Sequence, residues 1–148
     1  MKNVLILFCL AISISLTSCN DGCDEGNQPT PASFFIEIID ATSGENVFQN
    51  GTYTAQQVVV EDANEVAISI RFIENLNVIQ VFPPVSNLSG NTLLVKLNNT
   101  TTSQTDEISV TYDVSALAGE CFTTYNIENI LFPNNLSEWV ENIHVVKL

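Results

Sequence analysis

The residues of this chain that could do chemistry are four cysteines, a single histidine and 17 carboxylates. A nucleophilic triad needs a base beside the nucleophile and an orienting acid, and a zinc site needs three or four nitrogen or sulfur ligands. His144 alternates with Ile143 and Val145, which is typical of a surface position on a strand. With one histidine, and with each cysteine accounted for below, neither site can be assembled. The sequence therefore predicts no catalytic residue, no metal site and no cofactor.

Cys19 ends the segment Leu16-Thr17-Ser18-Cys19, which follows a short apolar run starting at Val4, behind Lys2. The run is far shorter than the roughly 20 residues that a membrane-spanning helix needs, so it indicates an export signal. The four residues resemble the lipobox of bacterial lipoprotein precursors, in which the cysteine thiol is alkylated with diacylglycerol and the chain is cut just before it. The resemblance implies a signal peptide over residues 1–18 and membrane attachment through Cys19. The alternative, an ordinary signal peptide, would favour an A-x-A-like cleavage site, which is missing here.

The two remaining cysteines predict a disulfide. Cys9 leaves with the signal and Cys19 is consumed by lipid, so Cys23 and Cys121 are left as an even pair in an oxidising compartment. Their bond would close a loop of about 100 residues. Two free thiols are the alternative, since the sequence does not reveal whether the two Cα atoms approach within the roughly 7 Å that a disulfide requires.

Carboxylates alone could support glycoside hydrolysis, which needs two acids flanking one cleft. The candidates are Glu37, Glu61, Glu65, Asp106, Glu107 and Asp113. No pair is marked by its surroundings, and acids that alternate with apolar residues normally form the wet face of a sheet. No D-x-D-x-D-G run for calcium is present either. The sequence therefore predicts that the protein is not an enzyme, with a carboxylate-dependent glycan hydrolase as the alternative.

Trp139 is the one aromatic residue that could form a ligand platform. It lies in the Asn-rich segment 133–140, where an exposed indole could stack on a sugar ring. A tryptophan in such a loop more often caps the end of a hydrophobic core, and we expect that role here.

Charge and composition place the chain outside the cell. A formal net charge of −13 should repel nucleic acid. Residues 19–32 are acidic and contain Gly and Pro, which is typical of a flexible tether. Their acids Asp21, Asp24 and Glu25 resemble the acidic run behind the lipidated cysteine of surface lipoproteins in Bacteroidota-type bacteria. The resemblance implies lipid anchoring in the outer membrane, facing the cell exterior, while attachment facing the periplasm is the alternative.

Residues 33–148 predict a single all-β domain, because apolar residues recur there with a period of two and no long amphipathic helix appears. The expected strands are residues 34–40, 57–61, 66–72, 78–82, 93–97, 108–114, 121–127 and 142–148. The first is apolar on both faces and should be central. Eight strands at this spacing predict a two-sheet antiparallel β-sandwich, immunoglobulin-like or a related Greek key, with a small barrel as the rival.

Three segments of these strands resemble a class of small, uncharacterised lipoproteins from the same bacteria. They are residues 35–46, residues 106–112, and Cys121 leading into Tyr125-Asn126-Ile127. The resemblance covers the whole mature chain and implies no established activity and no functional residues.

Export, charge and missing catalytic equipment together predict a non-catalytic binding, adhesion or envelope-assembly module. Its expected partners are the membrane, through the lipid on Cys19, and an unidentified envelope protein or glycan. A structural subunit that adds a strand to a neighbour is a further alternative, and it would need a regular, unpaired edge strand.

Overall fold

The computed structural model describes Cys23 and residues 28–148, and within them the chain folds as a β-sandwich. The signal segment and Cys19 lie outside the described residues. The elements in chain order are β1 (Phe34–Ile39), the 3-10 turn η2 (Ala55–Gln57), β2 (Val58–Asp62), β3 (Ile70–Ile73), β4 (Val78–Val81), β5 (Asn91–Asn99), β6 (Gln104–Ala118), β7 (Thr123–Leu131), β8 (Ser137–Val140) and β9 (Ile143–Lys147).

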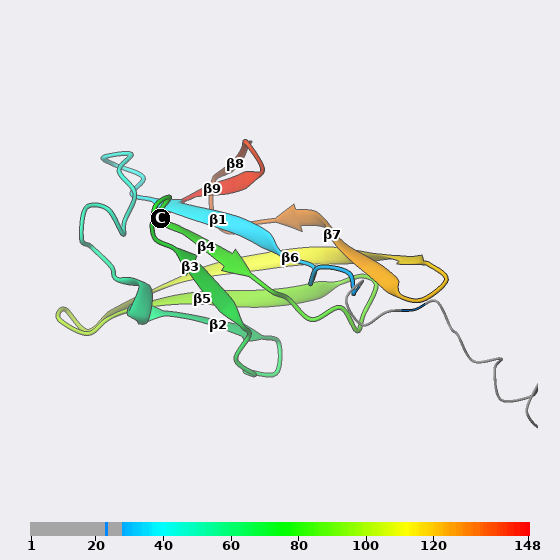
Figure 1. Ribbon diagram of the computed structural model, residues 1–148. Coiled ribbons are helices and arrows are strands. Elements are labelled where there is room, and N and C mark those ends of the chain that lie inside the picture. Colours follow the sequence, from blue (N-terminus) through cyan, green and yellow to red (C-terminus); the bar gives the residue numbers. More distant parts are fainter. Residues whose placement is uncertain (1–22, 24–27) are drawn as a thin grey trace, which may run out of the picture.

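The strands form two open sheets that pack face to face (Figure 1). One sheet has the order β3-β4-β1-β9-β8 and the other has the order β2-β5-β6-β7. The named strands form two separate sheets and not one closed sheet, so the barrel alternative is wrong. The expected antiparallel pairing holds everywhere among the named strands except between β1 and β9, which run parallel.

The core lies between the sheets and follows the predicted alternation. Ile36 and Ile38 of β1 are fully buried while their neighbours are half-buried, and β6 buries Ile108 and Val110 in the same way. β1 is the middle strand of its sheet, as its doubly apolar sequence predicts. A period-two pattern places every second side chain in the core, which explains why the sandwich could be predicted from sequence.

The run predicted as one strand over residues 66–72 is divided between the two sheets. The Ile68 amide donates to the Val60 carbonyl of β2 at 2.7 Å, whereas Ile70 and the following residues pair with β4. The chain therefore crosses from one sheet to the other at Ser69. Alternation continues through such a crossing, so the pattern alone does not reveal it.

Strand β8 was not predicted, because its residues follow an Asn-rich stretch. It pairs with β9 through a two-residue turn at Glu141 and Asn142, whose φ angles are 46° and 70°. Positive φ at both turn positions is typical of a type I′ hairpin. The asparagine was the available signal for this hairpin, although the usual glycine is missing.

The β6–β7 hairpin extends beyond the packed part of the sandwich (Figure 1). The inward-facing residues of β6 are buried as far as Val114, whereas Ala116 and Ala118 are exposed. The turn closes with a hydrogen bond from the Gly119 amide to the Phe122 carbonyl at 2.9 Å. This projecting hairpin forms one end of the long axis, and the loop between β5 and β6 lies at the other.

Candidate functional site

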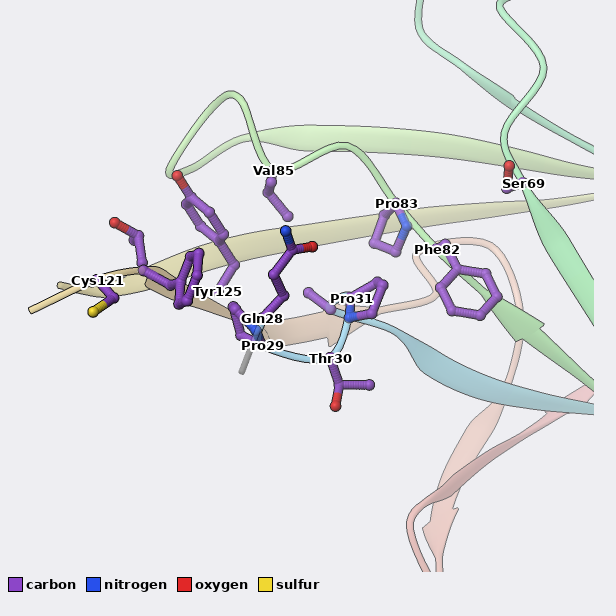
Figure 2. A pocket seen from close by; sticks show the side chains of 13 residues that line it. Gln28, Pro29, Thr30, Pro31, Ser69, Phe82, Pro83, Val85, Cys121 and Tyr125 are labelled. Carbon is purple, nitrogen blue, oxygen red and sulfur yellow. The ribbon is translucent and has the colours of Figure 1, made fainter. Parts of the chain in front are cut away.

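A cavity of about 650 Å³ lies at the hairpin end of the sandwich, and we call it the hairpin cavity (Figure 2). Its volume is in the range of small-molecule sites. Its lining comes from four separate parts of the chain and consists of Gln28, Pro29, Thr30, Pro31, Ala32, Ser69, Phe82, Pro83, Val85, Cys121, Phe122, Thr123 and Tyr125.

Strand register explains why these segments meet. Phe34 at the start of β1 pairs with Val81 at the end of β4, so residues 28–32 and 82–85 leave the sheet at the same end. The start of β7 in the opposite sheet supplies residues 121–125. The cavity is therefore the space between two sheets that part at the projecting hairpin.

The Cys23–Cys121 disulfide fixes one wall of the cavity. The structure joins the two cysteines with their Cα atoms 5.4 Å apart, as predicted, across 98 residues of sequence. The bond holds Cys23 against Cys121 in the hairpin turn. Pro29 and Ala32 are half-buried in this position, so the part of the predicted tether from residue 28 onward packs against the domain.

The lining of the hairpin cavity carries neither carboxylates nor cationic side chains. Figure 2 shows the Gln28 side chain extending between the Tyr125 ring and Pro83. Tyr125 is 36% exposed, which leaves part of its ring open to a ligand. Aromatic and proline surface with one amide and several hydroxyls suits an uncharged ligand, held by stacking and a few hydrogen bonds.

Trp139 does not cap the core, contrary to our expectation. It lies on the edge strand β8 and is 58% exposed. Its register partner is His144 of β9, and the two ring centroids are 4.3 Å apart in an edge-on arrangement. The indole is therefore a second exposed aromatic surface, on a strand rather than in a loop.

His144 does not lie on the surface, which corrects a further expectation. It pairs with the fully buried Ile36 and faces the same side of the sheet. The rings of Phe34 and Phe132 lie 6.2 and 5.4 Å from the imidazole, centroid to centroid. This burial lowers the pKa of His144 below its usual 6.5. Its register partners, which the sequence does not give, decide which face it occupies.

Several acidic residues of the described part are engaged in local contacts. Glu61 accepts an ion-pair hydrogen bond from Lys96 at 2.6 Å. The Asp62 carboxylate accepts amide hydrogen bonds from Val66 and Asn64, which lower its pKa. Glycoside hydrolysis needs one carboxyl with a raised pKa opposite a second acid. Asp62, with its lowered pKa, does not have the raised pKa that a general acid requires.

The described residues contain neither a cluster that could hold a metal ion nor a helix that could span a membrane. No group of three or more His, Cys, Asp or Glu side chains is arranged there to hold a metal ion. No helix in the same residues is long and apolar enough to cross a membrane.

The hairpin cavity was not predicted from the sequence. Gln28, Pro29 and Pro31 were assigned to the tether, and Tyr125 was noted only within a strand. The predicted disulfide was the available signal, because a bond from Cys23 to Cys121 necessarily brings these two regions together. Comparison with known proteins adds no assignment, since no family model, no curated protein and no solved structure matches the chain.

Proposed function

We propose that this protein is a lipid-anchored outer-membrane protein that faces the cell exterior. Its β-sandwich acts as a non-catalytic binding module, and the hairpin cavity is its ligand site. The observation that carries the proposal is the uncharged, aromatic and proline-rich lining of a cavity large enough for a small ligand. Such a lining supports binding and supplies no acid–base pair for turnover.

The ligand that best fits this lining is an uncharged glycan segment. A sugar ring presents an apolar face that can stack on Tyr125, and its hydroxyls suit the Gln28 amide and the Thr30 and Thr123 hydroxyls. An acidic glycan would meet a protein whose net charge is −13, which disfavours its approach.

Glycan arrays followed by calorimetry on the strongest neutral ligand test the site. Tyr125→Ala should weaken binding by about tenfold, since losing an aromatic stacking contact costs on the order of 1.4 kcal/mol. Trp139→Ala is the matched control, because it removes an exposed aromatic residue that does not line the hairpin cavity. If Trp139→Ala abolishes binding and Tyr125→Ala does not, the ligand site lies at β8 instead.

The anchor has its own test. Cys19→Ser should move the protein from the membrane fraction to the soluble fraction, because stable attachment depends on the acyl chains. Mass spectrometry of the wild-type amino-terminal peptide should show the acyl mass on Cys19. A peptide without that mass would refute lipid anchoring and leave the cavity proposal to the binding assays.

Strand addition by a partner has less support. Residues 29–33 line a common hollow with Thr124–Ile127, so they lie beside the free edge of β7. Pro29 and Pro31 have no amide hydrogen to offer a further strand. The edge strand β8 of the five-stranded sheet is four residues long, and short edge strands pair poorly with neighbouring chains.

A further inference from the structure

The disulfide places the lipid anchor next to the projecting hairpin. If Cys19 carries the lipid, as proposed above, the lipidated residue lies four positions before Cys23. An extended chain covers at most about 3.5 Å per residue, so the two Cα atoms are within about 14 Å of each other. The Cα of Cys121 is only 5.4 Å beyond Cys23. Without the bond, the anchor would reach the body only at Gln28, after about 32 Å of extended chain.

Because the domain is elongated, this short connection between Cys19 and the hairpin turn places one end of the domain close to the lipid anchor. β6 runs along the long axis for 15 residues, which is about 46 Å at about 3.3 Å per residue. Its hairpin end is held close to the anchor, whereas the loop after Asn99 lies a full strand length away. The two ends therefore cannot be equivalent with respect to a bilayer.

The strands of the projecting hairpin carry few charged side chains, whereas the sequence around its disulfide partner Cys23 is acidic, with Asp21, Asp24 and Glu25. From Val114 to Ile127 the one charged side chain is Glu120. Strand register puts Glu37 and Glu138 on one outer face together with Arg71 and Lys147, whereas the other outer face carries Glu61, Glu107, Asp113 and Glu128 beside the single cation Lys96. A domain lying on this second face would press a net negative surface against lipid headgroups, which repel it when they are anionic.

The hairpin tip also carries an exposed apolar side chain. Leu117 is 69% exposed, and its neighbours Ala116, Ala118 and Gly119 are small, uncharged and exposed. Such a tip can bring Leu117 to the boundary between headgroups and acyl chains.

We infer that the domain stands on the β6–β7 hairpin, with Leu117 in contact with the lipid surface and the loop at Thr100–Ser103 pointing away from it. The inference rests on the proposed lipid anchor at Cys19. It places the hairpin cavity at the membrane-proximal end, so a ligand is bound close to the bilayer.

Fluorescence quenching in vesicles tests this orientation. The lipidated mature chain is placed in vesicles of phosphatidylcholine and phosphatidylglycerol whose acyl chains are brominated. Trp139→Phe removes the one native tryptophan, and Leu117→Trp or Thr101→Trp then introduces a reporter at either end. We expect at least about twofold more quenching for Leu117→Trp, because only the hairpin tip reaches the acyl boundary.

A second pair of variants tests the role of the bond. With Cys23→Ser and Cys121→Ser added, a longer segment connects the lipid anchor to the domain. The difference in quenching between Leu117→Trp and Thr101→Trp should then become smaller. Equal quenching of both reporters in the disulfide-bonded protein would overturn the orientation. Vesicle flotation separates the two proposals: a protein that floats without quenching of Leu117→Trp refutes the orientation alone. A protein that does not float refutes the anchor and the orientation together.

Discussion

Removing the disulfide by the double substitution Cys23→Ser and Cys121→Ser should destabilise the domain strongly. The bond closes a loop that spans 98 positions, which is nearly the whole domain. Removing the bond therefore increases the conformational entropy of the unfolded chain over that loop. Chain-entropy arithmetic for a loop of this length gives about 4.7 kcal/mol as an upper value. Residues 28–32 keep their contacts with the hairpin in the folded state, so we expect a loss of between about 2 and about 4.7 kcal/mol.

Urea and thermal unfolding of the unlipidated Cys19→Ser protein measure this loss. The midpoint temperature should fall by roughly 10 to 20 °C, at roughly 4 °C per kcal/mol for a domain of this size. The urea m-value should rise, because the unfolded chain without the bond exposes more surface. Reducing the disulfide-bonded protein with dithiothreitol is the control and should reproduce both changes.

The reasoning fails if the double variant loses less than about 1 kcal/mol with an unchanged m-value. That result would mean that the bond does not constrain the unfolded chain. Recovery of both cysteines as free thiols from the exported protein would have the same consequence.

Three further predictions concern the body of the sandwich. Tyr53 is buried and donates a hydrogen bond to Asp106, and burial together with this bond raises the tyrosine pKa. Because Tyr53→Phe removes a hydrogen bond to a charged group, it should lower the free energy of unfolding by about 1.5 to 3 kcal/mol in urea titrations. Ile108→Ala should lower the free energy of unfolding by about 2 to 5 kcal/mol in the same titrations, because the side chain is fully buried in the core. A smaller loss would show that neighbouring core side chains fill the space that the truncated side chain leaves. Burial holds the folded-state pKa of His144 below 6.5, so the unfolded state binds its proton more readily and stability is lost as the pH falls below about 6.5. His144→Phe should remove that part of the pH dependence, and identical pH–stability curves for the two proteins would contradict the assignment.

Local patterns in the sequence were sufficient for most of the strands. Residues 34–40 and 108–114 alternate because one face of each strand is buried and the other is not, and this period survives in the sequence without knowledge of any partner. The Cys23–Cys121 bond could also be predicted, because eliminating Cys9 and Cys19 leaves a single pairing. Both arguments use chemistry that each residue carries by itself.

The ends of the strands and their partners depended on the tertiary structure. The run 66–72 alternates continuously, yet residues on either side of Ser69 pair with strands of different sheets. β8 is short and fully exposed, so no apolar period marks it, and it exists because β9 offers a hydrogen-bonding edge. The parallel pairing of β1 with β9 joins residues more than 100 positions apart, which no local pattern encodes.

The sequence by itself determined that the chain is acidic and built from half-buried strands, and it predicted the bond between Cys23 and Cys121. The tertiary structure decided where His144 and Trp139 face and brought residues 28–32, 82–85 and 121–125 around a common cavity. The reason is physical: alternation and cysteine chemistry are properties of short segments, whereas a binding site is made by side chains that meet only after both sheets have packed.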